Sequence, residues 1–477
     1  MNPPQPIPFS RRTFLQRHGV GLGMLGLSSL LSDEGLLASE AESSAHPLAP
    51  KRQHFPARAK HVIHILANGG PSQVDTFDPK PMLTRYHGQR LPMHLATERP
   101  TGAALGSPFK FKKYGQSGLE VSELFANLAE RHADDLCVIR SMFTDTPIHE
   151  NSLRMMNCGA SIMTRPSIGS WLTYGLGTEN QNLPGFVVLV PRGMPVAGAD
   201  NWQSAFLPGP FQGAYIETEG KKPRDLIEHL QNTAMTSVEQ RAQLDLVQRM
   251  NRKHLAQWDH DPALESRIHN YETAFHMQTA ATDAFDIEQE PAHIRALYGS
   301  TPQAAQMLMA RRLVERGVRY VQVWHGTLQP WDSHENLESE HRKLAAQSEQ
   351  GIAALLTDLK ARGLLDETLV VWGGEFGRTP TVELPQGGTV KSATGRDHNN
   401  HGFTVWLAGG GVKGGMAYGA TDEFGFKAVE NRVHVHDLHA TILHLMGLDH
   451  TKLTYRHSGR DFRLTDVEGD VVRGIIA

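Results

Sequence analysis

Short, continuous apolar runs recur along the chain after residue 60, and longer amphipathic stretches separate several of them. Continuous runs of about five to seven residues are typical of strands buried on both faces of a parallel sheet. We expect such strands at residues 61–66, 136–140, 186–190, 318–324, 368–372 and 403–408. Two stretches predict helices that precede strands, residues 301–316 and 336–362.

This alternation of strands and helices predicts an α/β fold with a mostly parallel central sheet flanked by helices. Between residues 221 and 278 the sequence is polar and favours helix, without a strand signal. We interpret this stretch as a helical insertion extending over about residues 221–297 of a domain that spans residues 61–477.

The first 45 residues have the layout of a twin-arginine (Tat) export signal. Arg11 and Arg12 precede an apolar run from Val20 to Leu31, and an Ala/Ser-rich exit follows. The run is shorter than the roughly 20 residues that a membrane-spanning helix needs. We therefore expect a linker over residues 46–60, export by the Tat machinery to the periplasm or cell envelope, and no transmembrane anchor after signal removal.

The composition excludes several classes of partner and site. The 47 Lys and Arg against 51 Asp and Glu give a net charge of -4, which argues against a nucleic-acid partner bound by counterion release. Two cysteines cannot form a disulfide scaffold or a Cys-rich zinc site. The 26 histidines instead direct attention to metals and proton chemistry.

Polar clusters lie directly after the first, second, fourth and fifth predicted strands, and another lies just before the sixth. Ligands of open α/β sheets bind outside the carboxyl ends of the strands, so four of these clusters should meet at one edge. The cluster from Arg396 to His401 precedes its strand and should reach that edge through its loop.

These clusters contain carboxylates and imidazoles that suit a divalent metal such as zinc, calcium or manganese. The candidate ligands are Asp332, His334, Glu375, Asp397, His398 and His401. They could fill one metal site or two, and a pair of ions would suit displacement at phosphorus or sulfur. Arg378 is a candidate oxyanion clamp, and the alternative for it is a structural salt bridge.

The C-terminal segment from Val435 to Leu448 resembles the closing helix of sulfatases and other alkaline phosphatase superfamily members, with Ala440 replacing a proline. More closely, residues 61–465 resemble a bacterial Tat-exported, sulfatase-like family of unknown function (domain of unknown function 1501). The shared motifs are Asn68-Gly69-Gly70-Pro71-Ser72, Phe77-Asp78-Pro79-Lys80-Pro81, Gly169-Ser170-Trp171, Leu183-Pro184-Gly185-Phe186-Val187, Glu375-Phe376-Gly377-Arg378-Thr379-Pro380 and Gly395-Arg396-Asp397-His398. The resemblance implies an alkaline-phosphatase-like fold.

The sequence also departs from the sulfatase pattern. The resemblance places His149 at the nucleophile position, with Asn151 and Leu153 replacing the Pro and Arg of the formylglycine motif. An early metal-binding Asp-Asp pair falls on Asn68 and Gly69, so a carboxylate ligand from this loop would be Asp75 or Asp78. We therefore do not expect a formylglycine sulfatase.

Two functional hypotheses follow. In the first, the protein is an exported metal-dependent hydrolase of sulfate or phosphate esters, acting on a small-molecule or polysaccharide substrate. His149 would then be nucleophile, base or a further ligand, and water activated by the metal is the alternative nucleophile. In the second, a catalytically inactive envelope protein uses the same fold to bind an anionic polysaccharide or a partner protein.

Overall fold

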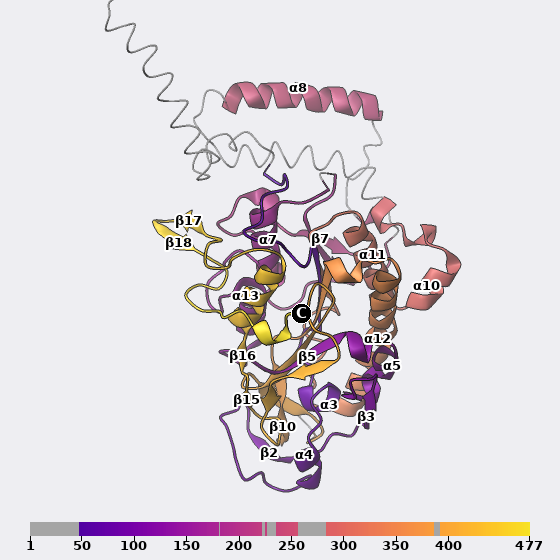
Figure 1. Cartoon of the computed structure of the whole chain (residues 1–477), viewed down its shortest axis with the longest axis vertical. Helices are drawn as coiled ribbons and strands as arrows, with labels where there is room; N and C mark the ends of the chain where they lie inside the picture. Colours follow the sequence, from indigo (N-terminus) through magenta and orange to yellow (C-terminus); the bar gives the residue numbers. More distant parts are fainter. Residues whose placement is uncertain (1–46, 181, 222–224, 227–234, 256–282, 386–391) are drawn as a thin grey trace, which may run out of the picture. The chain divides into compact units, whose positions relative to one another are not determined.

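The computed structural model describes residues 47–180, 182–221, 225–226, 235–255, 283–385 and 392–477. The predicted signal peptide at residues 1–45 lies outside these ranges. Residues Leu48–Ala477 form one compact unit. Figure 1 shows its sheet and helices.

The central sheet has nine strands in the order β13-β5-β12-β9-β1-β8-β6-β7, with β16 also paired to β5. All six predicted strands are present in it, and their apolar side chains are buried on both faces as expected. The bounds are β1 His61–Leu66, β5 Leu136–Phe143, β6 Phe186–Val190, β7 Ala214–Glu217, β8 Tyr320–Trp324, β9 Thr368–Gly373, β12 Phe403–Ala408, β13 Met416–Tyr418 and β16 Val433–His434. The predicted α/β class is therefore confirmed.

One strand of this sheet runs against the others. β12 pairs antiparallel with both β5 and β9, whereas β1 pairs parallel with β8 and β9. The start of β12 consequently lies at the edge where the parallel strands beside it, β5 and β9, end. The cluster before β12 therefore reaches this edge through the direction of the strand, and not through its loop as the sequence analysis expected.

Helices cover both faces of the sheet. On one face, α5 Ala126–His132, α11 Pro302–Glu315 and α12 Leu337–Ala361 share a core with Ile63, Ile65 and Val321. On the other face, α6 His149–Cys158, α7 Ile168–Leu176 and α13 Val435–Leu445 share a core with Val62 and Leu66. Successive side chains of β1 thus pack in the cores on opposite faces of the sheet, because side chains alternate along a strand.

A second, small antiparallel sheet has the order β11-β10-β2. Its strands are β2 Thr101–Ala104, β10 Gly377–Glu383 and β11 Arg396–Asn399. Parts of two polar clusters identified in the sequence therefore lie in paired strands, whereas Glu375 lies in the bend before β10. The remaining elements are α3 Gln73–Thr76, α4 Pro81–Arg85, α8 Ser237–Leu255, α10 Ala292–Tyr298, the hairpins β3 Phe111–Tyr114/β4 Leu119–Ser122 and β17 Tyr455–His457/β18 Arg460–Phe462, and the pair β14 Ala420–Thr421/β15 Ala428–Glu430.

The described parts of the predicted insertion contain the helices α8 and α10, and parts of the range 221–297 lie outside the described residues. The stretch predicted as a linker lies against the domain where it is described. Its backbone amides at Arg58 and Ala59 donate to the carbonyl of Leu445, and Ala59 is buried.

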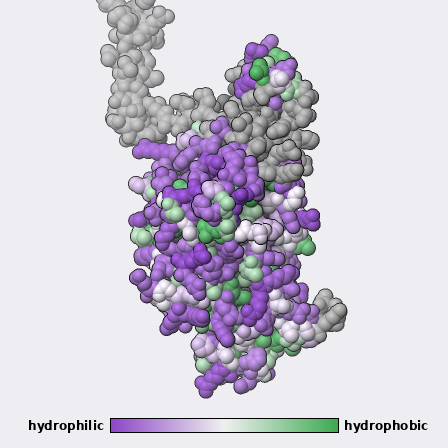
Figure 2. Space-filling model, turned by 90° about the vertical axis from the view of Figure 1, so that its right-hand side faces the viewer, coloured by the Kyte–Doolittle hydropathy of each residue, from purple (hydrophilic) through white to green (hydrophobic). Residues whose placement is uncertain are grey.

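The face of the molecule shown in Figure 2 is largely hydrophilic, with small, separate hydrophobic areas. Apolar side chains scattered singly over a surface are normal for globular proteins and do not indicate an interface. Among the described residues, no helix combines the length and the apolar character that crossing a bilayer requires.

Candidate metal centre

Asp332 lies at the centre of the polar clusters, in the loop between β8 and α12. Its backbone N–H donates to the carbonyl of Gln329 at 3.0 Å, and the neighbouring Trp331 N–H donates to the carbonyl of Asn68 at 3.1 Å. The first bond closes a turn within the loop, and the second holds the loop against the segment that follows β1. The side chain of Asp332 is 13% exposed, so its carboxylate is largely removed from water.

Three histidine rings present Nε2 to this carboxylate. Nε2 of His334 and of His398 lie 2.9 and 3.0 Å from Asp332 Oδ1, and Nε2 of His149 lies 3.3 Å from Oδ2. One nitrogen or oxygen atom from each of His149, Asp332 and His398 lies within 4.8 Å of the others, a spacing that a single ion can span. We refer to Asp332, His149, His334 and His398 as the Asp332 centre.

Each of the three rings uses Nδ1 to contact a second carboxylate. His149 Nδ1 lies 2.7 Å from Glu375 Oε1, and His398 Nδ1 lies 2.6 Å from Glu98 Oε2. His334 Nδ1 contacts Glu383 Oε2. A ring that donates Nδ1–H to a carboxylate directs the lone pair of Nε2 outward, which is how proteins orient metal-binding histidines.

The electrostatics of the centre favour an added positive charge. Burial on its own would raise the pKa of Asp332, but the charge of Arg378 and the contacts with the three histidine rings hold this pKa well below its usual range. Burial opposes protonation of His149, yet Asp332 and Glu375 outweigh it and raise the pKa of this ring to about 9. The two carboxylates therefore stabilise a cation at the position of His149 even without a metal.

Strand pairing explains why Arg378 and His398 meet at Asp332. Arg378 of β10 is directly opposite His398 of β11, and side chains at such cross-strand positions are neighbours. Arg378 Nη2 lies 2.5 Å from Asp332 Oδ1, while its other donors contact the carbonyls of Gly69, Gly70 and Arg396. The guanidinium is fully buried, which agrees with the salt-bridge alternative and leaves it little freedom to clamp a substrate.

Glu375 lies behind His149 rather than among the atoms that face Asp332. The backbone N–H of Gly69 lies 3.0 and 3.1 Å from its two carboxylate oxygens. Gly69 has φ of +110°, and an added Cβ would lie 2.7 Å from the backbone nitrogen of Asp332. Glycine is therefore required at position 69, where this loop approaches the loop of Asp332. Glu375 accepts a hydrogen bond from His149 and so orients its ring.

Two other residues predicted as ligands lie elsewhere. Asp75 is fully buried and accepts from Arg396 at 2.8 and 3.2 Å and from Ser72 at 2.5 Å, so both its oxygens are occupied. His401 Nε2 lies 3.4 Å from the carbonyl of Ala96 and belongs to none of the groups spaced for a metal within the described ranges.

Asp397 lies beside the Asp332 centre and not inside it. Its Oδ2 accepts from the backbone N–H of Arg99 at 2.7 Å, and its buried Oδ1 has no hydrogen-bond partner among the described residues. Burial raises the pKa of this carboxyl. It is spaced for a metal with Glu98 and His398, and with His334 and Glu383.

The sequence interpretation missed Glu98 and Glu383. Glu98 belongs to an irregular segment before β2, and Glu383 ends β10, so neither residue falls in a polar cluster at the end of a predicted strand. A lone glutamate in the otherwise neutral run 379–384 was the available signal for Glu383. Glu98 has no comparable signal.

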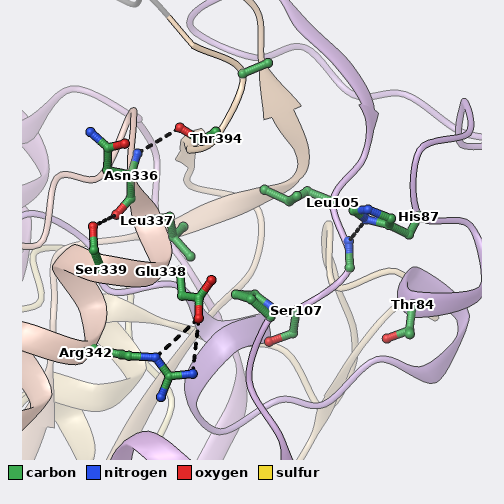
Figure 3. A pocket seen from close by; sticks show the side chains of 13 residues that line it. Thr84, His87, Leu105, Ser107, Asn336, Leu337, Glu338, Ser339, Arg342 and Thr394 are labelled. Carbon is green, nitrogen blue, oxygen red and sulfur yellow. Dashed lines mark hydrogen bonds and ion pairs between the residues drawn. The ribbon is translucent and has the colours of Figure 1, made fainter.

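A cavity of about 810 Å³ lies at the start of α12 and is separate from these residues (Figure 3). Its polar groups largely bond to one another: Asn336 N–H donates to Thr394 Oγ1 at 3.0 Å, and Arg342 pairs with Glu338 at 3.2 Å. None of the nine predicted site residues lines it. The cavity therefore gives no reason to move the candidate site away from the Asp332 centre.

Comparison with protein families gives a match over residues 59–476 to the family described as "Protein of unknown function (DUF1501)". No curated protein matches the chain.

Solved structures that resemble the chain have low sequence identity. Ps i-CgsB, solved with k-i-k-neocarrahexaose, is 11% identical with a TM-score of 0.36, covering 82% of this chain and 72% of that protein. The lipoteichoic acid synthase LtaP from Listeria monocytogenes is 8% identical with a TM-score of 0.33, covering 87% and 78%. A mutant alkaline phosphatase from the Antarctic bacterium TAB5, with Mg bound, is 10% identical with a TM-score of 0.34, covering 82% and 99%. At TM-scores below 0.5, these likenesses carry no argument about the chemistry of this chain.

Proposed function

The chain belongs to the DUF1501 family, and on that premise we propose that it is a metal-dependent hydrolase of sulfate or phosphate esters. The arrangement of three carboxylate-held histidines around Asp332 carries this proposal. We further propose Tat export to the periplasm or cell envelope and a small-molecule or polysaccharide ester as substrate, for which the N-terminal sequence and the family resemblance are the support.

The residues present fit a divalent metal. His149 Nε2 and His334 Nε2 are buried and have no hydrogen bond of good geometry, which is costly unless another partner satisfies them. His149, His398 and Asp332, which are spaced for a single ion, would hold it, and His334 contacts the same carboxylate. Glu375, Glu98 and Glu383 would orient the three rings. Imidazole ligands favour zinc over calcium, because calcium prefers oxygen ligands.

When bound, such an ion supplies Lewis acidity that polarises a phosphoryl or sulfuryl oxygen and acidifies water. We assign water as the attacking group and His149 as a ligand, because Nδ1 and Nε2 of this ring both face carboxylates. Arg378 keeps Asp332 ionised and positioned by its direct contact with Oδ1. The buried setting limits competition from bulk water for these interactions.

The test is elemental analysis of the natively exported protein by inductively coupled plasma mass spectrometry, followed by assays with sulfate and phosphate esters. We expect about one bound ion per centre, and hydrolysis that chelation abolishes and metal restores. Asp332→Asn should reduce both the metal content and the rate of hydrolysis, because it removes the negative charge that three histidines share. A protein that stays free of metal after reconstitution would contradict the proposal. Bound metal without ester hydrolysis would favour the envelope-binding alternative, to be tested with anionic polysaccharides.

A further inference from the structure

A cationic side chain that reaches the anionic group of a sulfate or phosphate ester can bind it and stabilise its charge during hydrolysis. Arg378 is not placed for this role, because its guanidinium is fully buried against three carbonyls and Asp332. The other guanidinium that contacts these carboxylates in the described structure belongs to Arg99, whose side chain is 33% exposed.

Arg99 is held directly beside the Asp332 centre. Its backbone N–H donates to Asp397 Oδ2 at 2.7 Å, and the preceding residue, Glu98, accepts from His398 Nδ1. Its guanidinium Nη1 lies 3.2 Å from Glu383 Oε1, and the other oxygen of Glu383 contacts His334. Glu98 thus contacts His398 directly, and Arg99 contacts Glu383, the carboxylate that orients His334.

The guanidinium retains unused hydrogen-bonding capacity. Its contact with Glu383 uses Nη1, and no described residue bonds its Nε or Nη2. A guanidinium offers five N–H donors in a fork that matches two oxygens of a tetrahedral anion. Arg99 can therefore pair with Glu383 and still donate to a ligand.

The carboxylates around the Asp332 centre repel an anionic substrate, and a cationic donor would offset this repulsion. Asp332, Glu375, Glu383, Glu98 and Asp397 are all carboxylates within this hydrogen-bonded group, and they repel an approaching anion. A bound metal would offset part of this repulsion, and an exposed guanidinium beside it would offset more. We propose that Arg99 binds the sulfate or phosphate group of the substrate, an inference that rests on the proposed function.

The test compares Arg99→Gln and Arg99→Lys with the matched control Arg90→Gln, an exposed arginine of the preceding segment. Isothermal titration of the metal-loaded full chain measures the Kd of inorganic phosphate and of sulfate. We expect Arg99→Gln to weaken binding of at least one of them by roughly tenfold or more, because a charge-assisted pair is lost. The Kd of Arg99→Lys should lie between those of Arg99→Gln and the wild type, because lysine keeps the charge and lacks the forked donors of arginine. Arg90→Gln should bind as the wild type does.

Metal content is measured in the same samples. The expected result is weaker anion binding at unchanged metal content. Unchanged anion affinity in Arg99→Gln, or a wild-type protein that binds neither anion, would overturn the assignment. Loss of metal in both Arg99 variants would also overturn it, because Arg99 would then act only by positioning Glu383. An ester-hydrolysing protein with unchanged anion affinity in Arg99→Gln would refute the role of Arg99 alone, whereas a protein without metal would refute the proposed function.

Discussion

His398 Nε2 lies 3.0 Å from Asp332 Oδ1 although 66 residues separate them in the chain. One residue lies on a strand of the small sheet and the other in a loop after the central sheet. The contact therefore exists only when both sheets are formed and correctly placed. Metal binding at this point should depend on the folded state and stabilise it.

We predict that His398→Gln loses bound metal and that His401→Gln retains it. His398 faces Asp332, whereas the ring of His401 faces a backbone carbonyl outside the Asp332 centre. Mass spectrometric metal analysis after gel filtration of folded protein distinguishes the two variants. Loss of metal in His401→Gln, with retention in His398→Gln, would contradict the proposed ligand set.

We predict that Glu375→Gln weakens metal affinity by about 10- to 100-fold without abolishing it, because losing an orienting acceptor typically has this effect. The amide keeps an oxygen for the Gly69 N–H but no longer carries the charge that orients His149. Competition with a chelator measures the affinity. Glu338→Gln, an exposed change on α12, serves as the control and should leave affinity unchanged. If Glu375→Gln changed metal affinity as little as Glu338→Gln does, the carboxylate of Glu375 would not support the site.

We predict that Asp75→Asn lowers stability and that the folded fraction keeps its metal. Arg396 would be left buried without its charged partner, which typically costs about 3–5 kcal/mol. The exposed pair of Arg456 and Asp461 supplies the control, because Asp461→Asn should cost less than about 1 kcal/mol. Urea unfolding and metal analysis measure the two effects. A stable Asp75→Asn variant without metal would instead restore Asp75 as a ligand.

We predict that acidification destabilises the fold through His439. Burial lowers the pKa of this ring to about 3, with His436 adding to the effect. Below the ordinary histidine pKa of about 6.5, the unfolded chain therefore binds a proton that the folded chain does not. Stability should fall as pH drops from about 6.5 towards about 3, by about 1.4 kcal/mol per pH unit for this residue.

Thermal unfolding of His439→Gln between pH 7 and 4.5 should show a shallower pH dependence than the wild type. His293→Gln removes an exposed histidine of α10 and should keep the wild-type dependence. Equal slopes in His439→Gln and the wild type would show that His439 does not stay neutral in the folded protein.

The sequence by itself determined the α/β class, the positions of the six principal strands and the gathering of Asp332, His334 and Glu375 at one edge. These features follow from local hydrophobic runs and from the rule that parallel strands end together. Both depend on residues close to one another in the chain. That is why they could be predicted without knowing how distant segments pair.

Only the tertiary structure decided which polar atoms face Asp332. The antiparallel direction of β12 and the pairing of Arg378 with His398 set these positions, and no local pattern encodes them. For the same reason, Asp75 pairs with Arg396 across 321 residues, and Glu98 meets His398 across 300. A carboxylate that binds a metal, one that orients a histidine and one that neutralises a buried arginine look alike in sequence, because their roles depend on the partner that long-range packing supplies.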